Sequence, residues 1–236
     1  MHIHDPWLKL MHGPLWISPE RINTLKKQVK ESTISAIDLM RNYKRLGEEC
    51  DPKELGRAIS RCSYQQAVPP YLYYMAEKIT PIHREELHDC LLRSRRGPQA
   101  GHAAVMVDVS AGMYQPAGEG LTRLEIAASY AVTMTYPQKR LFTVSDNIVE
   151  VPQAAGLGGI DRITMAQRPG CQFMRQACRD ILRFGNFSHL VVFTDKIFYE
   201  PLPAELHVVT QPGQYLLRPD VPFQKKYMVH GNSTIH

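Results

Sequence analysis

The sequence predicts a Rossmann-like α/β domain, with a mostly parallel sheet flanked by helices, preceded by a small all-helical region. From His102 onward, short apolar runs alternate with helical patterns, as expected where helices cover a parallel sheet. The first hundred residues carry repeated helix-start signals instead. A polar stretch with Gly and Pro at 93–98 separates the parts. The predicted organisation is a helical region at 1–97, an α/β domain at 102–215 and an extended C-terminal arm at 216–236.

Composition restricts the class of protein without naming a partner. The 236 residues are 44% hydrophobic and 22% charged, and no apolar run is long enough to span a membrane. The N-terminus shows no secretory signal, so the sequence predicts an intracellular, cytoplasmic protein with no membrane partner. Five cysteines without a C-x-x-C pair indicate reduced thiols rather than a disulfide framework. The net charge of +5 is compatible with a phosphate-bearing partner but does not require one.

Helix punctuation organises the N-terminal region. Ser18-Pro-Glu20 combines an N-cap with a proline at the first helical position, and apolar residues then recur at mostly three- and four-residue spacing as far as Leu46-Gly47. We therefore expect one long helix over these residues. Further helices should start after Asp51 and Thr80, with a short helix at 71–79 between them.

Basic residues lie along or beside this long predicted helix. They are Lys26, Lys27, Lys30, Lys44 and Arg45. One hypothesis is that they contact RNA phosphates. The alternative is a solvated helix face, since acidic residues are interspersed and no aromatic stacking platform lies among them.

The second part reads as strands separated by helices. Runs rich in β-branched and aromatic residues predict strands at 102–108, 140–145, 148–151, 189–194 and 205–210. The pattern Thr122-x-x-Glu125 is a capping box that should open a helix over 124–134. A second helix is expected over 172–184, and the glycine-rich segment 156–159 is interpreted as a turn.

Two predicted strands end on an aspartate. Val105-Met-Val-Asp-Val-Ser-Ala-Gly-Met113 places Asp108 there, and Leu190-Val-Val-Phe-Thr-Asp195 places Asp195. The carboxyl ends of parallel strands meet at one edge, where ligands of such sheets bind, and oxygen donors are what Mg²⁺ prefers. The alternative is structural, with both aspartates accepting loop N–H groups and Ser110 capping a helix.

These segments resemble the von Willebrand factor A family over about residues 102–215. The loop at 107–113 is similar to the first part of that family's metal-ion-dependent adhesion site, and 121–128, 142–152 and 190–195 follow in the family's order. The resemblance implies Mg²⁺ as a cofactor, held by Asp108, Ser110 and Asp195. Gly112 and Cys171 stand where the family has hydroxyl ligands, so the implied site is degenerate, and the alternative is a site without an ion. A second alignment puts Gly158-Gly-Ile160 in place of the segment that ends at Cys171.

The predicted function is binding rather than catalysis. The first hypothesis is a protein-binding scaffold subunit of a larger intracellular assembly, which docks on other subunits through the A-type domain. Helices ahead of that domain and the run Val192-Phe-Thr-Asp-Lys-Ile-Phe-Tyr-Glu-Pro-Leu-Pro203 also resemble the Ro autoantigen group, whose members bind RNA. The alternative is therefore an RNA-associated protein. Catalysis by Cys171 at a helix N-terminus is a third reading that lacks an identifiable base, so we expect no enzyme.

Overall fold

The computed structural model describes residues 18–62, 68–94, 101–118, 120–152, 154–171, 174–187, 189–195 and 207–210. Contacts divide the chain into two compact units, 1–95 and 96–236. The predicted C-terminal arm at 216–236 and most of the Ro-like run after Asp195 lie outside the described residues. No helix within the described ranges is both long enough and apolar enough to cross a membrane.

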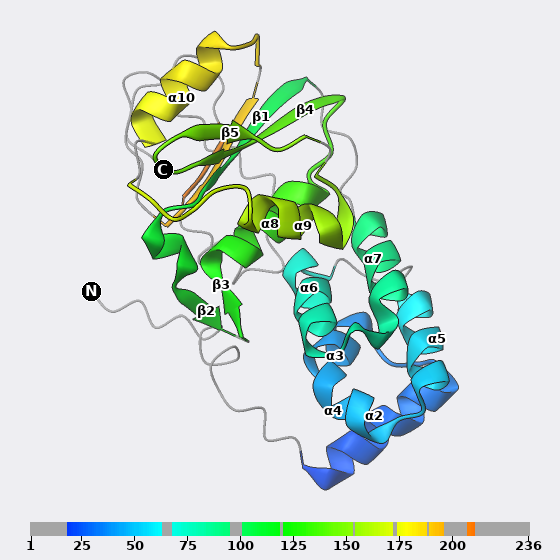
Figure 1. The fold of residues 1–236 in the computed structure, drawn as a ribbon. Helices are drawn as coiled ribbons and strands as arrows, with labels where there is room; N and C mark the ends of the chain where they lie inside the picture. Colours follow the sequence, from blue (N-terminus) through cyan, green and yellow to red (C-terminus); the bar gives the residue numbers. More distant parts are fainter. Residues whose placement is uncertain are drawn as a thin grey trace, which may run out of the picture. The chain divides into compact units, whose positions relative to one another are not determined.

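The single long helix expected at the N-terminus is wrong, because three helices occupy those residues (Figure 1). They are α2 (Pro19–Glu31), α3 (Ala36–Arg41) and α4 (Tyr43–Glu49). Ser32 adopts a left-handed conformation with φ 54° and ends α2. The Ser35 hydroxyl then accepts a hydrogen bond from Asp38 N and starts α3. Local serine chemistry thus stops the helix although the apolar spacing continues.

Four more helical elements complete this unit. They are α5 (Pro52–Cys62), α6 (Pro70–Ile79), the 3₁₀ turn η1 (Pro81–His83) and α7 (Arg84–Arg93). Their starts after Asp51 and Thr80 and the short helix at 71–79 confirm those predictions. Helices α5 and α6 both pack against α7, and Leu55, Ile59, Leu87 and Leu91 are buried in the core.

All five cysteines are free thiols, as predicted. In the helical unit, Cys62 donates a hydrogen bond to Ile34 O at 3.6 Å and Cys90 donates one to Ile59 O at 3.4 Å. Burial raises the pKa of the Cys62 thiol to about 11 and that of Cys90 to about 12. Both therefore stay protonated near neutral pH and serve as buried donors.

The second unit is built on a five-stranded sheet of order β5-β4-β1-β6-β7. The strands are β1 (His102–Asp108), β4 (Gln138–Val144), β5 (Ile148–Glu150), β6 (His189–Thr194) and β7 (His207–Thr210). All neighbours pair in parallel except β4 and β5, which are antiparallel. The mostly parallel α/β prediction is confirmed at this level. A short η2 (Ala111–Tyr114) and the hairpin β2 (Pro116–Gly118) and β3 (Leu121–Thr122) follow β1.

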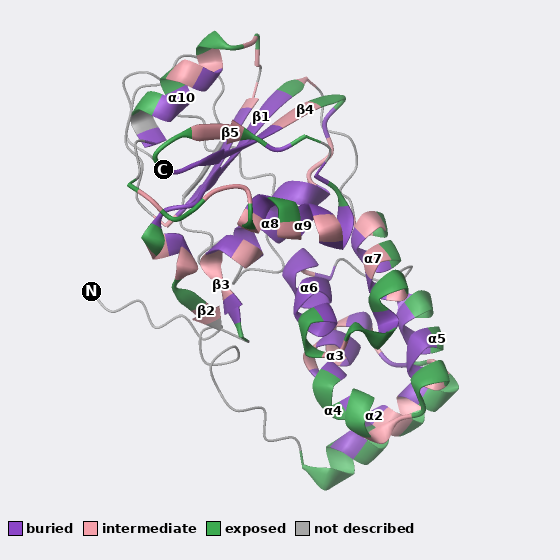
Figure 2. Cartoon of the chain, viewed as in Figure 1, coloured by how far each residue is buried: buried purple, intermediate pink, exposed green. Residues whose placement is uncertain are grey.

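Helices cover both faces of the sheet. Residues 104 and 106 of β1 face α10 (Met174–Arg183), and their cluster includes Cys178 and Ile181. On the opposite face lie α8 (Arg123–Thr133) and α9 (Gly156–Thr164), which contact each other, and α8 also contacts β1 (Figure 1). The central strand is buried from Ala103 to Asp108 (Figure 2). The predicted capping box at Thr122 and Glu125 opens α8.

Helix α9 corrects the prediction of a turn at 156–159. Gly159 packs so closely that an added Cβ would lie 2.8 Å from the Ala154 backbone and 3.1 Å from a Val132 side-chain atom. The glycine therefore permits close packing against α8, and tertiary contact outweighs its low helix propensity. Because Gly158-Gly-Ile160 lies inside this helix, the second alignment of the metal site does not place these residues on a loop.

Candidate functional site

The carboxyl edge of the sheet is organised around Asp108, the last residue of β1. Its side chain is fully buried. One carboxylate oxygen accepts a hydrogen bond from Ser110 N at 2.7 Å, and the other accepts one from Thr194 Oγ1, also at 2.7 Å. Since Thr194 ends β6, Asp108 ties the ends of two adjacent strands together.

Ser110 starts the loop that leaves β1, and its hydroxyl is the first unusual feature of this edge. The residue is 3% exposed. Its Oγ lies near Asp108 and favours the ionised form of that carboxyl group. However, Oγ forms no hydrogen bond of normal geometry with any described residue. A buried hydroxyl without a partner is uncommon and marks a position where a ligand or water can bind.

Asp195 follows β6 and leans against Gly112. A Cβ built at Gly112 would collide with Asp195 Oδ2, so the glycine leaves the space that this carboxylate occupies. Oδ2 also faces Arg123 Nη1 at 3.5 Å, whereas Oδ1 is buried and has no hydrogen-bond partner among the described residues. The Asp195 side chain is only 12% exposed. Gly112 therefore lacks a hydroxyl ligand but leaves room for the Asp195 carboxylate at this edge.

Hydrogen bonds hold a second loop, which contains Gly170, beside the loop that follows β1. Gly170 forms a parallel bridge with Ser110, and Cys171 N donates a hydrogen bond to Asp146 Oδ1 at 2.7 Å. The hydroxyl of Ser145 donates to Arg168 O at 3.0 Å. Gly170 and Cys171 therefore lie on a loop at this edge, next to Ser110. Cys171 itself is exposed, and its position does not supply the hydroxyl that the family has there.

Burial and charge act in opposite directions on Asp108. Desolvation is the largest influence and raises the pKa of the carboxyl group above its usual range, and the nearby Asp195 charge adds to the rise. Hydrogen bonds from Thr194 and Ser110 oppose it. A positive charge at this edge would favour the ionised form of Asp108. Arg123 supplies one from the partly exposed side.

The donor set can be compared with what a cation needs. Asp108, Ser110 and Asp195 offer only oxygen atoms, which suits a hard cation such as Mg²⁺ and not a soft transition metal. Across the described residues, no group of three or more His, Cys, Asp or Glu side chains could hold a metal. The edge therefore offers two carboxylates and one hydroxyl, and a hydrated Mg²⁺ bound there would need water or a partner's oxygen at its other positions.

The basic residues predicted to contact RNA are placed on α2 and α4, and three of the five are paired with acids. Lys26 and Arg45 both contact Glu49, at 3.2 and 2.6 Å, and Lys27 contacts Glu31 at 3.8 Å. Lys30 and Lys44 are exposed. Within the described part of the helical unit, neither of these two lysines forms an ion pair. The five cations therefore do not act as one unpaired patch.

Sequence reasoning missed two residues at the carboxyl edge. Thr194 was assigned only to a strand, although its hydroxyl binds Asp108. Arg123 is one of the two unspecified residues of the Thr122-x-x-Glu125 capping pattern, which predicts no role for it. Its guanidinium group nevertheless contacts Asp195, which lies 72 positions further along the chain. The position of Thr194 directly before Asp195 was a usable signal for the first. No local pattern indicated the second.

No family model and no curated protein matches the sequence. Among solved structures, the chain is similar to the crystal structure of the Deinococcus radiodurans Ro (RSR) protein, with a TM-score of 0.54 and 13% sequence identity. The likeness covers 75% of this chain and 46% of the Ro protein, so the chain spans less than half of that protein's length. At this identity the likeness concerns the fold, and it supports the Ro-like resemblance at that level.

Proposed function

We propose that the α/β unit is a non-catalytic binding module that engages a protein partner at the carboxyl edge of its sheet. Asp108, Ser110 and Asp195 would hold a hydrated Mg²⁺, and an acidic side chain of the partner would complete its coordination. The ion supplies a positive charge between two acidic surfaces. This protein's own residues position the ion, since β1 and β6 fix the two aspartates.

The observation that supports this proposal is the presence of two buried, unpaired oxygen atoms beside a buried carboxylate. Ser110 Oγ and Asp195 Oδ1 have no hydrogen-bond partner among the described residues. Leaving such an atom unsatisfied costs about 1–3 kcal/mol. A cation with its bound water would satisfy both atoms and offset the repulsion between Asp108 and Asp195.

Arg123 gives this site a built-in competitor for the cation. Its guanidinium group faces Asp195 Oδ2 at 3.5 Å and is 41% exposed. In the absence of an ion it neutralises part of the acidic charge, and the exposed side chain can swing away when an ion binds. Arg123→Gln should therefore raise the affinity for Mg²⁺.

The thermal midpoint of the purified chain with Mg²⁺, with Mn²⁺ and with EDTA tests the cation site. A ligand bound only by the folded state raises the midpoint by mass action. We expect a rise that disappears in Asp195→Asn and persists in Asp146→Asn, which changes a carboxylate at the same edge outside the proposed ligand set. No rise with either cation, or an equal loss in both variants, would contradict the site.

The docking step has its own test. Acetate can stand in for the partner's carboxylate, so it should increase the apparent affinity for Mn²⁺ in the wild-type chain, measured by isothermal titration calorimetry. Chloride at the same ionic strength is the control. Cation binding that is indifferent to acetate would separate an ion site from an adhesion site and would contradict the docking proposal.

The structural likeness to a Ro protein favours a second candidate, an RNA-associated role for the helical unit. The exposed Lys30 and Lys44 would carry it, because the other predicted cations already face carboxylates. Binding to a single-stranded RNA should then weaken steeply with salt. The double variant Lys30→Gln/Lys44→Gln should reduce the salt slope, whereas Arg183→Gln in the α/β unit should not. An unchanged slope would contradict this candidate.

A further inference from the structure

The helical unit contains a basic groove that the proposed function does not use. It has a volume of about 510 Å³ and is lined by Lys53, Arg57, Ser60, Arg61, His83 and Glu86, together with Pro52 and Gly56. The cationic residues lie on α5, whereas His83 lies in η1 and Glu86 lies on α7. The groove therefore lies between elements that pack directly on each other.

Helical spacing places the three cations on one face. Lys53, Arg57 and Arg61 follow each other at intervals of four residues, so their side chains lie in one row along α5. All three are exposed. None of them forms an ion pair with another described residue. Like charges at this spacing destabilise a helix, and a bound anion would remove that repulsion.

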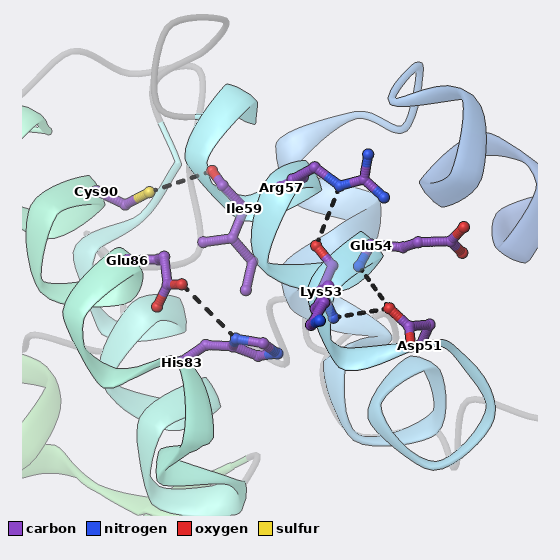
Figure 3. Close-up of polar contacts among 8 residues, drawn as sticks. All are labelled: Asp51, Lys53, Glu54, Arg57, Ile59, His83, Glu86 and Cys90. Atoms are coloured by element: carbon purple, nitrogen blue, oxygen red, sulfur yellow. Dashed lines mark hydrogen bonds and ion pairs between the residues drawn. The ribbon is translucent and has the colours of Figure 1, made fainter.

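His83 is a buried polar residue that lines the groove. The residue is only 5% exposed, and its Nε2 has no hydrogen-bond partner among the described residues. Its other nitrogen, Nδ1, lies 4.0 Å from Glu86 Oε1. Figure 3 shows the ring extending from its own helical turn toward α5, beside Lys53. With a hydrogen on Nε2, this nitrogen is a donor that no described residue uses.

Gly56 allows this arrangement. A Cβ at this position would lie 3.2 Å from Glu86 Oε1 and 3.3 Å from the His83 ring. Because position 56 has no side chain, the His83 ring and the Glu86 carboxylate can lie directly against α5. A histidine with one nitrogen near a carboxylate and the other unpaired is suited to binding an anion.

An apolar hollow adjoins the basic groove. Its lining includes Leu55, Pro81 and Ile82, and it shares Pro52 and His83 with the groove. Ile82 is 64% exposed, which is high for a large apolar side chain. The two hollows meet at His83, so a ligand could place a charged group on one side of the ring and an apolar group on the other.

We propose that this paired groove binds a phosphate monoester whose organic part is apolar. The phosphate lies between Arg57, Arg61 and His83 Nε2, and the organic part covers Ile82 and Pro81. Guanidinium groups bind phosphate oxygens through paired hydrogen bonds, and a dianion matches a row of three cations better than a single carboxylate does. The site lies in a different unit from the cation-binding edge, so either proposal can fail without the other.

Calorimetric titration of the full chain with inorganic phosphate and with phenyl phosphate tests the proposal. We expect both to bind saturably, with phenyl phosphate the tighter ligand. Arg57→Gln should weaken each by about tenfold, the loss expected for one charge-assisted hydrogen bond. Arg21→Gln is the matched control, since Arg21 is an exposed arginine on α2 outside the groove. Ile82→Gln should remove the advantage of phenyl phosphate without weakening inorganic phosphate.

Imidazole NMR provides a second readout that does not depend on a variant of a buried residue. Phosphate should shift the Nε2 resonance of His83 and leave that of His102 in the other unit unchanged. The proposal is overturned if neither ligand binds saturably, if Arg57→Gln and Arg21→Gln weaken binding equally, or if the His83 resonance does not move at saturation.

Discussion

The two candidate sites are built in opposite ways. At the carboxyl edge of the sheet, short buried side chains from the ends of different strands converge, and Asp108 accepts hydrogen bonds from the Ser110 backbone N and from the Thr194 hydroxyl. In the basic groove, long exposed side chains project from one helix, and a buried histidine, His83, lies beside them. The first arrangement also holds the fold together, whereas the second is largely added to its surface.

This difference predicts how each site responds to substitution. Groups that share hydrogen-bond partners are energetically coupled, and removing one disturbs the others. Separate cations on a solvated helix face contribute nearly independently. Changes at the acidic edge should therefore alter stability and binding together, while changes in the groove should alter binding alone.

The largest effect is expected for Asp108→Ala. The change leaves Ser110 N and the Thr194 hydroxyl without their acceptor in a buried setting, which should lower the free energy of unfolding by about 3 kcal/mol. Urea denaturation followed by circular dichroism measures it. Asp146→Ala, at an exposed position on the same edge, should cost clearly less. Equal losses would show that burial does not distinguish the two carboxylates.

A smaller loss is expected for Gly112→Ala. The new methyl group must displace the Asp195 carboxylate from its place beside Arg123, which should cost about 1–2 kcal/mol. It should also abolish the Mg²⁺ response. Gly158→Ala is the matched control, because a Cβ there meets nothing within 4 Å in α9. That control should stabilise the protein by about 0.5–1 kcal/mol. If both variants destabilise equally, the contact with Asp195 does not matter.

The pH dependence should show a graded effect from Asp108. Its pKa in the folded protein is raised, chiefly by burial, so the folded state binds this proton more tightly than the unfolded state does. Stability contributed by the protonated group is then present at low pH. It is lost as pH rises above the ordinary carboxyl value of about 3.9 and through the raised pKa. The difference in unfolding free energy between wild type and Asp108→Asn should fall over that window, and Mg²⁺ should reduce the fall.

The smallest stability effect is expected in the groove. Arg57→Gln and Arg61→Gln should each change the free energy of unfolding by less than about 0.5 kcal/mol, as for other exposed positions. Their effects on phosphate affinity should multiply in the double variant, measured by calorimetry. Strong coupling between them would mean that the groove is organised like the acidic edge, and the comparison would no longer hold.

Much of the α/β unit could be predicted because its signals are local. The apolar runs marked the strands, and strand direction alone brought Asp108 and Asp195 to one edge. The helix α9 was missed because Gly156, Gly158 and Gly159 suggest a turn, and only packing against α8 explains the last of them. The role of Gly112 was also hidden, since the sequence showed a lost ligand and not the space it leaves for Asp195.

The helical unit was harder to predict for a related reason. Apolar residues recur at mostly three- and four-residue spacing on both sides of residues 32–35, whereas the break between α2 and α3 depends on Ser32 and Ser35. Asn42 divides α3 from α4 without a side-chain cap. The basic groove requires His83 to return beside Gly56, 27 positions earlier in the sequence, and this contact is set by tertiary packing.

Each unit contains buried thiols whose reactivity can report when that unit unfolds. Cys62 and Cys90 lie in the helical unit and Cys178 lies on α10 in the other unit; these three thiols are buried, whereas Cys171 is exposed. A thiol reagent should modify Cys171 at once and reach the others only when their unit opens. The order in which they react would therefore record which half of the molecule unfolds first, without any added label.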